Sequence, residues 1–188
     1  GEVLGEALVR GSVFTTISIV TTTGFVTENF DLWPLAGRVI LVLLMFIGGC
    51  ASSTGGAIKH VRILVLLKSI GSELKRLFHP RSVFPVKLGG KPVSGSIVSS
   101  IMAFIGLYML FFVAGLLTML LFGLDLASAI GAAAATLGNI GPGMGAVGAV
   151  GNYAGIPAAG KWVLSLLMMA GRLELLPIAV LFTRHFWH

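Results

Sequence analysis

The chain has 188 residues, of which 56% are hydrophobic and 11% are charged, and its formal net charge is +6. Soluble domains average roughly 45–50% apolar and about 25% charged residues, so this composition excludes an ordinary soluble domain and predicts an integral membrane protein. Because the chain begins at Gly1 rather than Met, we expect it to be a piece of a longer protein.

The first predicted element is a moderately apolar helix from Gly5 to Val20, which stops at a threonine-rich segment ending in Gly24. A similar element comes later in the chain: residues 126–137 are apolar and rich in alanine, but ~18 Å of helix covers only about half of a ~30 Å hydrocarbon core. We interpret both as half-helices that enter the membrane and turn back. Asp125 and Glu6 are predicted to pair with the free amide groups at the starts of these helices.

Residues 35–70 would form a continuous helix of ~54 Å, which is too long for one crossing. The small residues from Gly48 to Ala57 therefore divide this segment into two pieces. Non-helical backbone at membrane depth is tolerated only where it is buried in protein or lines a water-filled cavity. The break therefore indicates a conduit rather than a simple anchor.

The connector that follows carries more than the whole positive surplus of the chain. Its basic residues, opposed only by Glu73, are Lys59, Arg62, Lys68, Lys75, Arg76, Arg81, Lys87 and Lys91. Clustered lysine and arginine beside membrane spans mark the cytoplasmic side. We therefore expect a cytoplasmic connector, and we do not expect nucleic acid as a partner.

Residues 97–122 predict the clearest transmembrane helix, ~39 Å long, and residues 161–183 predict a second one of ~35 Å. The second span contains Arg172, which costs ~2.5–3.5 kcal/mol on insertion scales unless it faces a partner inside the protein. The exposed carbonyl groups of the 48–56 loop are the expected partner, and Arg172 is then a barrier across the conduit. The alternative is that Arg172 only ties two helices together.

Two glycine-bearing segments follow the half-helices, and we interpret them as ion-coordinating strands. They are Thr22, Thr23 and Gly24 in the first and Asn139, Ile140 and Gly141 in the second. Backbone carbonyl groups on such strands can replace the water shell of a cation, and glycine permits the positive φ that this geometry needs. The alternative is a pair of ordinary glycine turns between helices. We expect the two units to be a repeat in architecture whose residues have diverged.

Taken together, these segments resemble the TrkH/KtrB potassium-uptake family. The resemblance is carried by the loop 48–56 with Ile58 and Lys59, by residues 137–143, and by residues 171–174. It implies an all-α membrane protein of the potassium channel type, with tandem helix, pore-loop and helix units, re-entrant half-helices and a broken transmembrane helix. It also implies that four such units surround one potassium path, of which this chain holds the end of the third and all of the fourth.

The resemblance assigns the residues as follows. Residues 1–31 are the pore helix and filter strand of the third unit, and 32–75 its second helix, interrupted by the loop 48–57. Residues 76–95 are the basic connector, and 96–188 the fourth unit: helix 96–123, pore helix 125–137, filter 138–143, outer loop 144–159 and last helix 160–184. The implied gate consists of Gly48, Gly49, Ser52, Ser53, Thr54, Gly55, Gly56 and Arg172.

The expected function is potassium transport across the cell inner membrane by an ion-conducting subunit, which carries no enzymatic activity and no organic cofactor. The resemblance further implies a homodimer and a cytosolic nucleotide-binding subunit of the TrkA or KtrA type. The connector 76–95 and the C-terminus are expected in the cytoplasm. Two alternatives stay open: an ion-coupled carrier (a symporter) with a midplane site in the broken helix, and a non-conducting membrane subunit that docks a cytosolic sensor.

Overall fold

The computed structural model describes residues 2–50, 55–79, 82 and 84–173, and these residues are mainly helical. Six α-helices occur in this part of the chain: α1 (Glu2–Val20), α2 (Leu35–Met45), α3 (His60–Phe78), α4 (Gly95–Leu121), α5 (Leu126–Leu137) and α6 (Ala158–Arg172). Three short 3-10 helices lie in the loops: η1 (Phe30–Leu32), η2 (Gly145–Val147) and η3 (Tyr153–Gly155). The predicted all-helical class is therefore right for the described residues apart from four two-residue strands.

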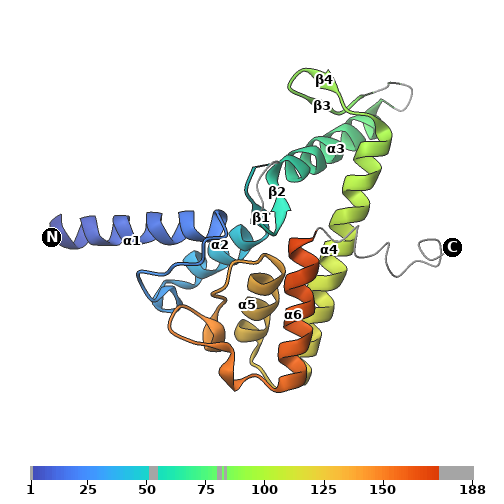
Figure 1. Ribbon diagram of the computed structural model, residues 1–188. Coiled ribbons are helices and arrows are strands. Elements are labelled where there is room, and N and C mark those ends of the chain that lie inside the picture. Colours follow the sequence, from blue (N-terminus) through green and yellow to red (C-terminus); the bar gives the residue numbers. More distant parts are fainter. Residues whose placement is uncertain (1, 51–54, 80–81, 83, 174–188) are drawn as a thin grey trace.

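Those strands form two small pairs. β1 (Ile47–Gly48) pairs in parallel with β2 (Ile58–Lys59), and β3 (Lys87–Leu88) pairs with β4 (Lys91–Pro92) in an antiparallel hairpin. The first pair joins the two sides of the predicted break between α2 and α3. The second lies at the far end of α3, in the basic connector (Figure 1).

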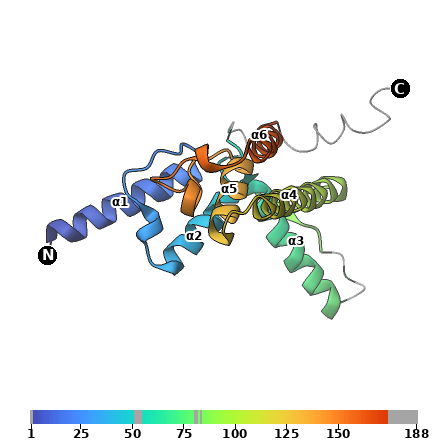
Figure 2. The same cartoon turned by 90° about the horizontal axis from the view of Figure 1, so that it is seen from below.

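The core of the molecule surrounds α5. Figures 1 and 2 show α4, α5 and α6 clustered together, while α1 and α3 extend away from the cluster in different directions. Most of α5 is buried because its small side chains let the neighbouring helices approach closely. At Gly131, for example, an added Cβ would lie 2.1 Å from the backbone nitrogen of Met144.

Among the described residues, α4 is the one helix that is long and apolar enough to cross a membrane. The apolar helices Leu8–Val20, Leu35–Met45 and Leu126–Leu137 are shorter. The structure ends α6 at Arg172, and residues 174–184 of the last predicted helix lie outside the described residues.

Asp125 begins α5 as predicted: its carboxylate accepts a hydrogen bond of 3.2 Å from the Ser128 amide. The matching prediction for Glu6 is wrong, because α1 begins at Glu2 and places Glu6 beyond the free amide groups of the first turn.

The two units share more sequence than we predicted. Residues 34–48 and 157–171 are identical at eight of fifteen aligned positions, where Pro, Ala, Gly, Leu, Leu, Leu, Met and Gly recur in the same order. Pro34 and Pro157 cap α2 and α6 with nearly the same backbone angles, φ −52° and ψ 147° against φ −55° and ψ 150°. The expectation of diverged residues is therefore wrong for these helices, although it holds for the segments before them.

Candidate functional site

The two predicted filter segments have positive φ angles at matching positions. Thr22 and Asn139, each the second residue after its helix, have φ of 56° and 55°. Gly24 and Gly141, two residues further on, also have positive φ, at 77° and 108°. A β-branched residue such as Thr22 rarely adopts positive φ, and strain of about 1–3 kcal/mol of this kind concentrates at functional sites.

Matching hydrogen bonds close the two turns. The Thr23 amide donates to the Ser18 carbonyl at 2.8 Å, and the Ile140 amide donates to the Ala135 carbonyl at 2.9 Å. The amides of the two residues with φ near 55° donate to the third residue before them, at 3.1 Å in both cases. α1 and α5 thus both end in a Schellman-type turn, in which carbonyl groups of the last helical turn accept local hydrogen bonds and the chain changes direction sharply.

The two segments meet in space. A Cβ atom on Gly24 would lie 2.1 Å from the carbonyl oxygen of Ile140, so only glycine permits this approach. The Ile140 side chain is buried with Ile19 and Met144, which anchors the second segment in the core. The structure therefore brings together the residues that the sequence predicted as ion-coordinating strands.

The second segment is held from behind by α6 and the outer loop. The Asn139 side-chain amide donates to the Met168 carbonyl at 3.0 Å, and the Tyr153 hydroxyl donates to the Gly141 carbonyl at 2.8 Å. The Lys161 ammonium in turn holds the Tyr153 turn through the Ala154 carbonyl at 2.9 Å. Burial raises the pKa of Tyr153 to about 12, so its hydroxyl stays a donor at all physiological pH values.

The first segment is held by hydroxyl groups instead. The Ser18 hydroxyl donates to the Phe25 carbonyl at 2.7 Å, and the hydroxyls of Thr21 and Thr23 lie 2.8 Å apart. A carboxylate joins the loops beyond the two segments, because Asp31 accepts a 3.0 Å hydrogen bond from the Gly145 amide. Sequence reasoning assigned no role to Tyr153, Lys161 or Asp31.

The predicted gate loop lies partly outside the described residues, because positions 51–54, including Ser52, Ser53 and Thr54, are not described. Its two ends are placed. The imidazole Nδ1 of His60 lies 3.2 Å from the Gly48 carbonyl oxygen and 3.0 Å from that of Gly49. At the other end, a Cβ on Gly56 would lie 2.3 Å from the Gly138 carbonyl oxygen, so the loop returns directly beside the C-terminal end of α5.

The end of α6 reaches the same place. A Cβ on Gly171 would lie 1.9 Å from the Leu137 carbonyl oxygen and 2.8 Å from Nδ2 of Asn139. Arg172 follows and is exposed, and within the described part of the chain it has no hydrogen bond or ion pair. Its predicted contact with the loop carbonyls therefore remains a prediction.

No cluster of three or more His, Cys, Asp or Glu side chains that could hold a metal ion occurs among the described residues. The only cysteine of the chain, Cys50, is exposed. The arrangement offers backbone carbonyl groups, with polar side chains behind them that hold the two segments by hydrogen bonds. Chemically, such a site suits a weakly held monovalent cation rather than a tightly bound structural metal.

The chain is similar to known proteins. Residues 4–188 match the family model TrkH, described as a cation transport protein. The Trk system potassium uptake protein TrkH of Vibrio parahaemolyticus is 44% identical over 176 residues, which cover 94% of this chain and 36% of that protein. The TrkH of Escherichia coli strain K12 is 41% identical over 179 residues, covering 95% of this chain and 37% of that protein.

A solved structure is similar as well. The crystal structure of the potassium transporter TrkH from Vibrio parahaemolyticus matches with a TM-score of 0.85 and 44% identity, over 93% of this chain and 37% of that one. The chain thus spans little more than a third of the length of the relatives it matches.

Proposed function

Since the chain belongs to the TrkH family of cation transport proteins, we propose that it is the C-terminal part of a membrane subunit that conducts potassium. The approach of Gly24 to the Ile140 carbonyl is the observation that carries this proposal, because it joins two segments that both have positive φ at matching positions. The relatives are named as potassium uptake proteins, which supports potassium as the transported ion. Conduction itself belongs to the longer protein.

In this proposal the carbonyl groups of six residues form two sides of the selectivity filter: Thr22, Thr23, Gly24, Asn139, Ile140 and Gly141. A dehydrating cation needs several fixed oxygens, and rings of backbone carbonyl groups supply them. The C-terminal ends of α1 and α5 lie next to these segments, and the partial negative charge there attracts a cation.

The proposed gate consists of Gly48, Gly49, Ser52, Ser53, Thr54, Gly55, Gly56 and Arg172. Two close approaches support it: Gly56 lies beside the Gly138 carbonyl, and Gly171 lies beside the Leu137 carbonyl. The loop end and the α6 end therefore converge on the base of the second filter segment. Arg172 stands next to this point, where its positive charge would oppose the passage of a cation.

The gate is tested by replacing the arginine. Arg172→Ala in the full-length protein should increase rubidium flux into liposomes several-fold, with Arg76→Ala, which removes an exposed arginine of α3, as the matched control. Unchanged or reduced flux in a correctly inserted Arg172→Ala protein would reject the gating role. That result would instead favour the reading in which Arg172 only joins helices.

Transport is tested with the full-length protein reconstituted in potassium-loaded liposomes. We expect rubidium uptake by the native protein and its loss in Gly141→Ser, because the φ of 108° at Gly141 is strained for any residue but glycine. Gly155→Ser is the control, because Gly155 also has nothing within 4 Å of a built Cβ but lacks a positive φ. Uptake without unitary currents would favour the ion-coupled carrier. Absence of uptake would favour the non-conducting docking subunit.

The same proposal places the protein in the cell inner membrane as a multi-pass homodimer, with the connector 76–95 and the C-terminus in the cytoplasm. The family match and the length and apolar composition of α4 support the membrane location. The name "Trk system" carried by the relatives supports further subunits, and we propose a cytosolic nucleotide-binding partner of the TrkA or KtrA type. Co-purification of that partner with the full-length protein tests this assignment.

A further inference from the structure

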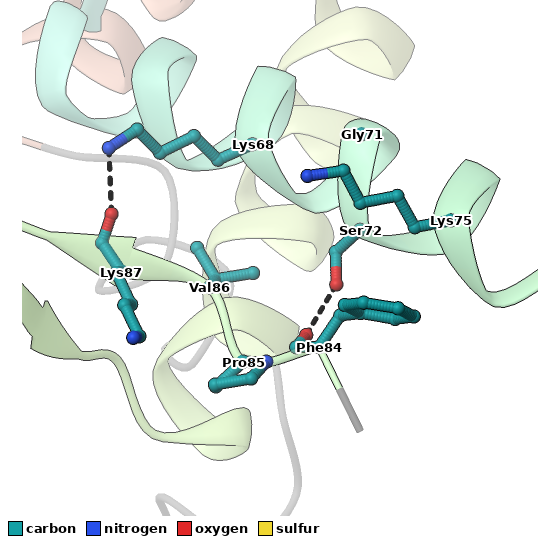
Figure 3. Close-up of a pocket in the computed structure, with 8 residues that line it drawn as sticks. All are labelled: Lys68, Gly71, Ser72, Lys75, Phe84, Pro85, Val86 and Lys87. Atoms are coloured by element: carbon teal, nitrogen blue, oxygen red, sulfur yellow. Dashed lines mark hydrogen bonds between the residues drawn. The ribbon is translucent and has the colours of Figure 1, made fainter. Parts of the chain in front are cut away.

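A basic pocket lies between the second half of α3 and the segment that leads into β3. It has a volume of about 590 Å³, and it is lined by Lys68, Gly71, Ser72, Lys75, Phe84, Pro85, Val86 and Lys87. Figure 3 shows the side chains of Lys68 and Lys75 on the α3 side of the pocket and the segment 84–87 on the other. The proposed ion path makes no use of this pocket.

Two hydrogen bonds hold the pocket open. The Lys68 ammonium donates to the Lys87 carbonyl at 2.7 Å, and the Ser72 hydroxyl donates to the Phe84 carbonyl. Gly71 lies between these two positions on the helix, and nothing lies within 4 Å of a Cβ built on it. The space above Gly71 is therefore accessible between two fixed contacts.

The charges around the pocket favour an anion. Lys68 and Lys75 both line it, and in Figure 3 the Lys75 side chain extends back over Gly71 toward Lys68. The nearby carboxylate, Glu73, does not line the pocket and pairs with Arg76 at 2.8 Å. The charged groups that line the pocket belong to Lys68, Lys75 and Lys87, and an ammonium group is a hydrogen-bond donor only.

An exposed apolar surface runs along α3 directly beside these lysines. It consists of Leu64, Leu67, Ile70, Leu74, Leu77 and Phe78, whose side chains are 44–81% exposed. Leu67 precedes Lys68 and Leu74 precedes Lys75, so the same leucine–lysine step occurs twice, two helical turns apart. A helix with an apolar face beside a lysine-lined face is typical of one that lies at a membrane surface.

The position of α3 on α4 agrees with this placement. The Arg62 guanidinium lies 3.9 Å from the centre of the Phe104 ring, so the start of α3 crosses α4 ~14 Å from the first residue of that helix. Further along, residues of α3 from Ser69 to Arg76 share a cleft with Gly95 and Val98 of α4. The pocket therefore lies at the N-terminal end of α4, where a spanning helix meets the headgroups.

We propose that Lys68 and Lys75 bind the phosphate of an anionic phospholipid, whose acyl chains lie along the exposed leucines of α3. A free phosphate would use the lysines but not the apolar face, and an acidic protein segment would leave that face exposed to water. A phospholipid fits both surfaces at once, and basic pockets at the cytoplasmic ends of membrane helices are suited to such headgroups. This site is independent of the proposed conduction path.

The test uses the full-length protein in detergent, incubated with phosphatidylglycerol and analysed by native mass spectrometry. Phosphatidylcholine is the zwitterionic comparison, and millimolar inorganic phosphate is the competitor. We expect Lys68→Gln/Lys75→Gln to lower retained phosphatidylglycerol about 10-fold, because each lysine contributes to attraction of an anionic headgroup. Arg76→Gln, which removes a charge from another face of α3, should retain it.

A second pair of variants distinguishes binding in the pocket from nonspecific attraction to positive charge. Gly71→Phe should block the pocket and reduce retention to the level of the double lysine variant, whereas Gly71→Ala should leave it unchanged. Four results would each overturn the proposal. Gly71→Phe could retain as much phosphatidylglycerol as the native protein, or Arg76→Gln could lose as much as the double lysine variant. The native protein could retain phosphatidylcholine as well as phosphatidylglycerol, or inorganic phosphate could displace the lipid. Unchanged lipid retention in Lys68→Gln/Lys75→Gln, together with lost binding of an acidic protein partner, would also overturn it.

Discussion

The carbonyl oxygen of Ile140 and the α-carbon of Gly24 approach so closely that an alanine at position 24 would place its Cβ 2.1 Å from that oxygen. This distance is far shorter than a van der Waals contact, and the opposing atom belongs to the backbone. The approach thus links two segments that come from different units of the chain.

Gly24→Ala should therefore displace the Ile140 carbonyl and reduce rubidium uptake by the full-length protein at least ~10-fold, because a filter oxygen moves and the φ of 77° becomes strained. Uptake into liposomes measures this effect. Gly155→Ala, with open space around its Cβ, should keep native uptake. Native uptake by Gly24→Ala would contradict the assignment of this contact to the filter.

Tyr153→Phe removes the hydroxyl that donates to the Gly141 carbonyl and leaves the ring in place. Because one such hydrogen bond contributes about 0.5–1.5 kcal/mol, we expect the ratio of potassium to sodium flux to fall about 2- to 10-fold. Competition of the two ions for rubidium uptake measures the ratio. Ser165→Ala removes a local hydrogen bond within α6, beside a cavity that Gly141 and Tyr153 also line, and it should not change the flux ratio.

Asp31→Ala removes the carboxylate that accepts from the Gly145 amide. A hydrogen bond to a charged group contributes about 1.5–3 kcal/mol, so the free energy of unfolding should fall by about that amount. Thermal unfolding of the full-length protein in detergent measures the change. Glu73→Ala serves as the comparison: its pair with Arg76 is exposed, so its loss should change stability by less than ~1 kcal/mol.

Asp125 gives stability that depends on pH. The hydrogen bonds from the Ser128 side chain and amide hold the pKa of the Asp125 carboxyl below its usual value. The ionised carboxylate therefore stabilises the folded state above the usual pKa of about 3.9, and this contribution is lost as the pH falls through the lower, folded-state pKa.

We expect Asp125→Asn, which keeps a capping oxygen but loses the charge, to be less stable by about 0.3–1 kcal/mol at pH 7. The difference from the native protein should shrink as the pH falls below the usual carboxyl pKa of about 3.9. Melting temperatures measured across this pH range test it. A difference that stays constant down to pH 2 would show that the charge of Asp125 is not responsible.

The helices and the positive φ angles of the two glycines in the proposed filter segments were predictable from the sequence because their signals are local. Length and hydropathy predicted α4, and the brevity of residues 126–137 predicted a half-helix. Gly24 and Gly141 marked the positions of positive φ. The equal φ of Thr22 and Asn139 was not predicted, because neither side chain favours that conformation strongly enough to indicate it.

Contacts between distant residues were not accessible in this way. Asp31 and Gly145 are 114 residues apart, and no periodicity connects a carboxylate with an amide at that separation. His60 contacts Gly48 and Gly49 only because β1 and β2 bring the two sides of the break together. By contrast, the recurrence of residues 34–48 at 157–171 was visible in the sequence and would have aligned Arg38 with Lys161.

The pairing of Ile47 with Ile58 holds the two ends of the loop between them side by side. The Ile58 amide donates to the Phe46 carbonyl at 3.0 Å, so main-chain hydrogen bonds join the end of α2 to the segment that leads into α3. Separation of α2 from α3 would first have to break these main-chain hydrogen bonds. A force exerted on α3 therefore acts on the pairing of β1 with β2.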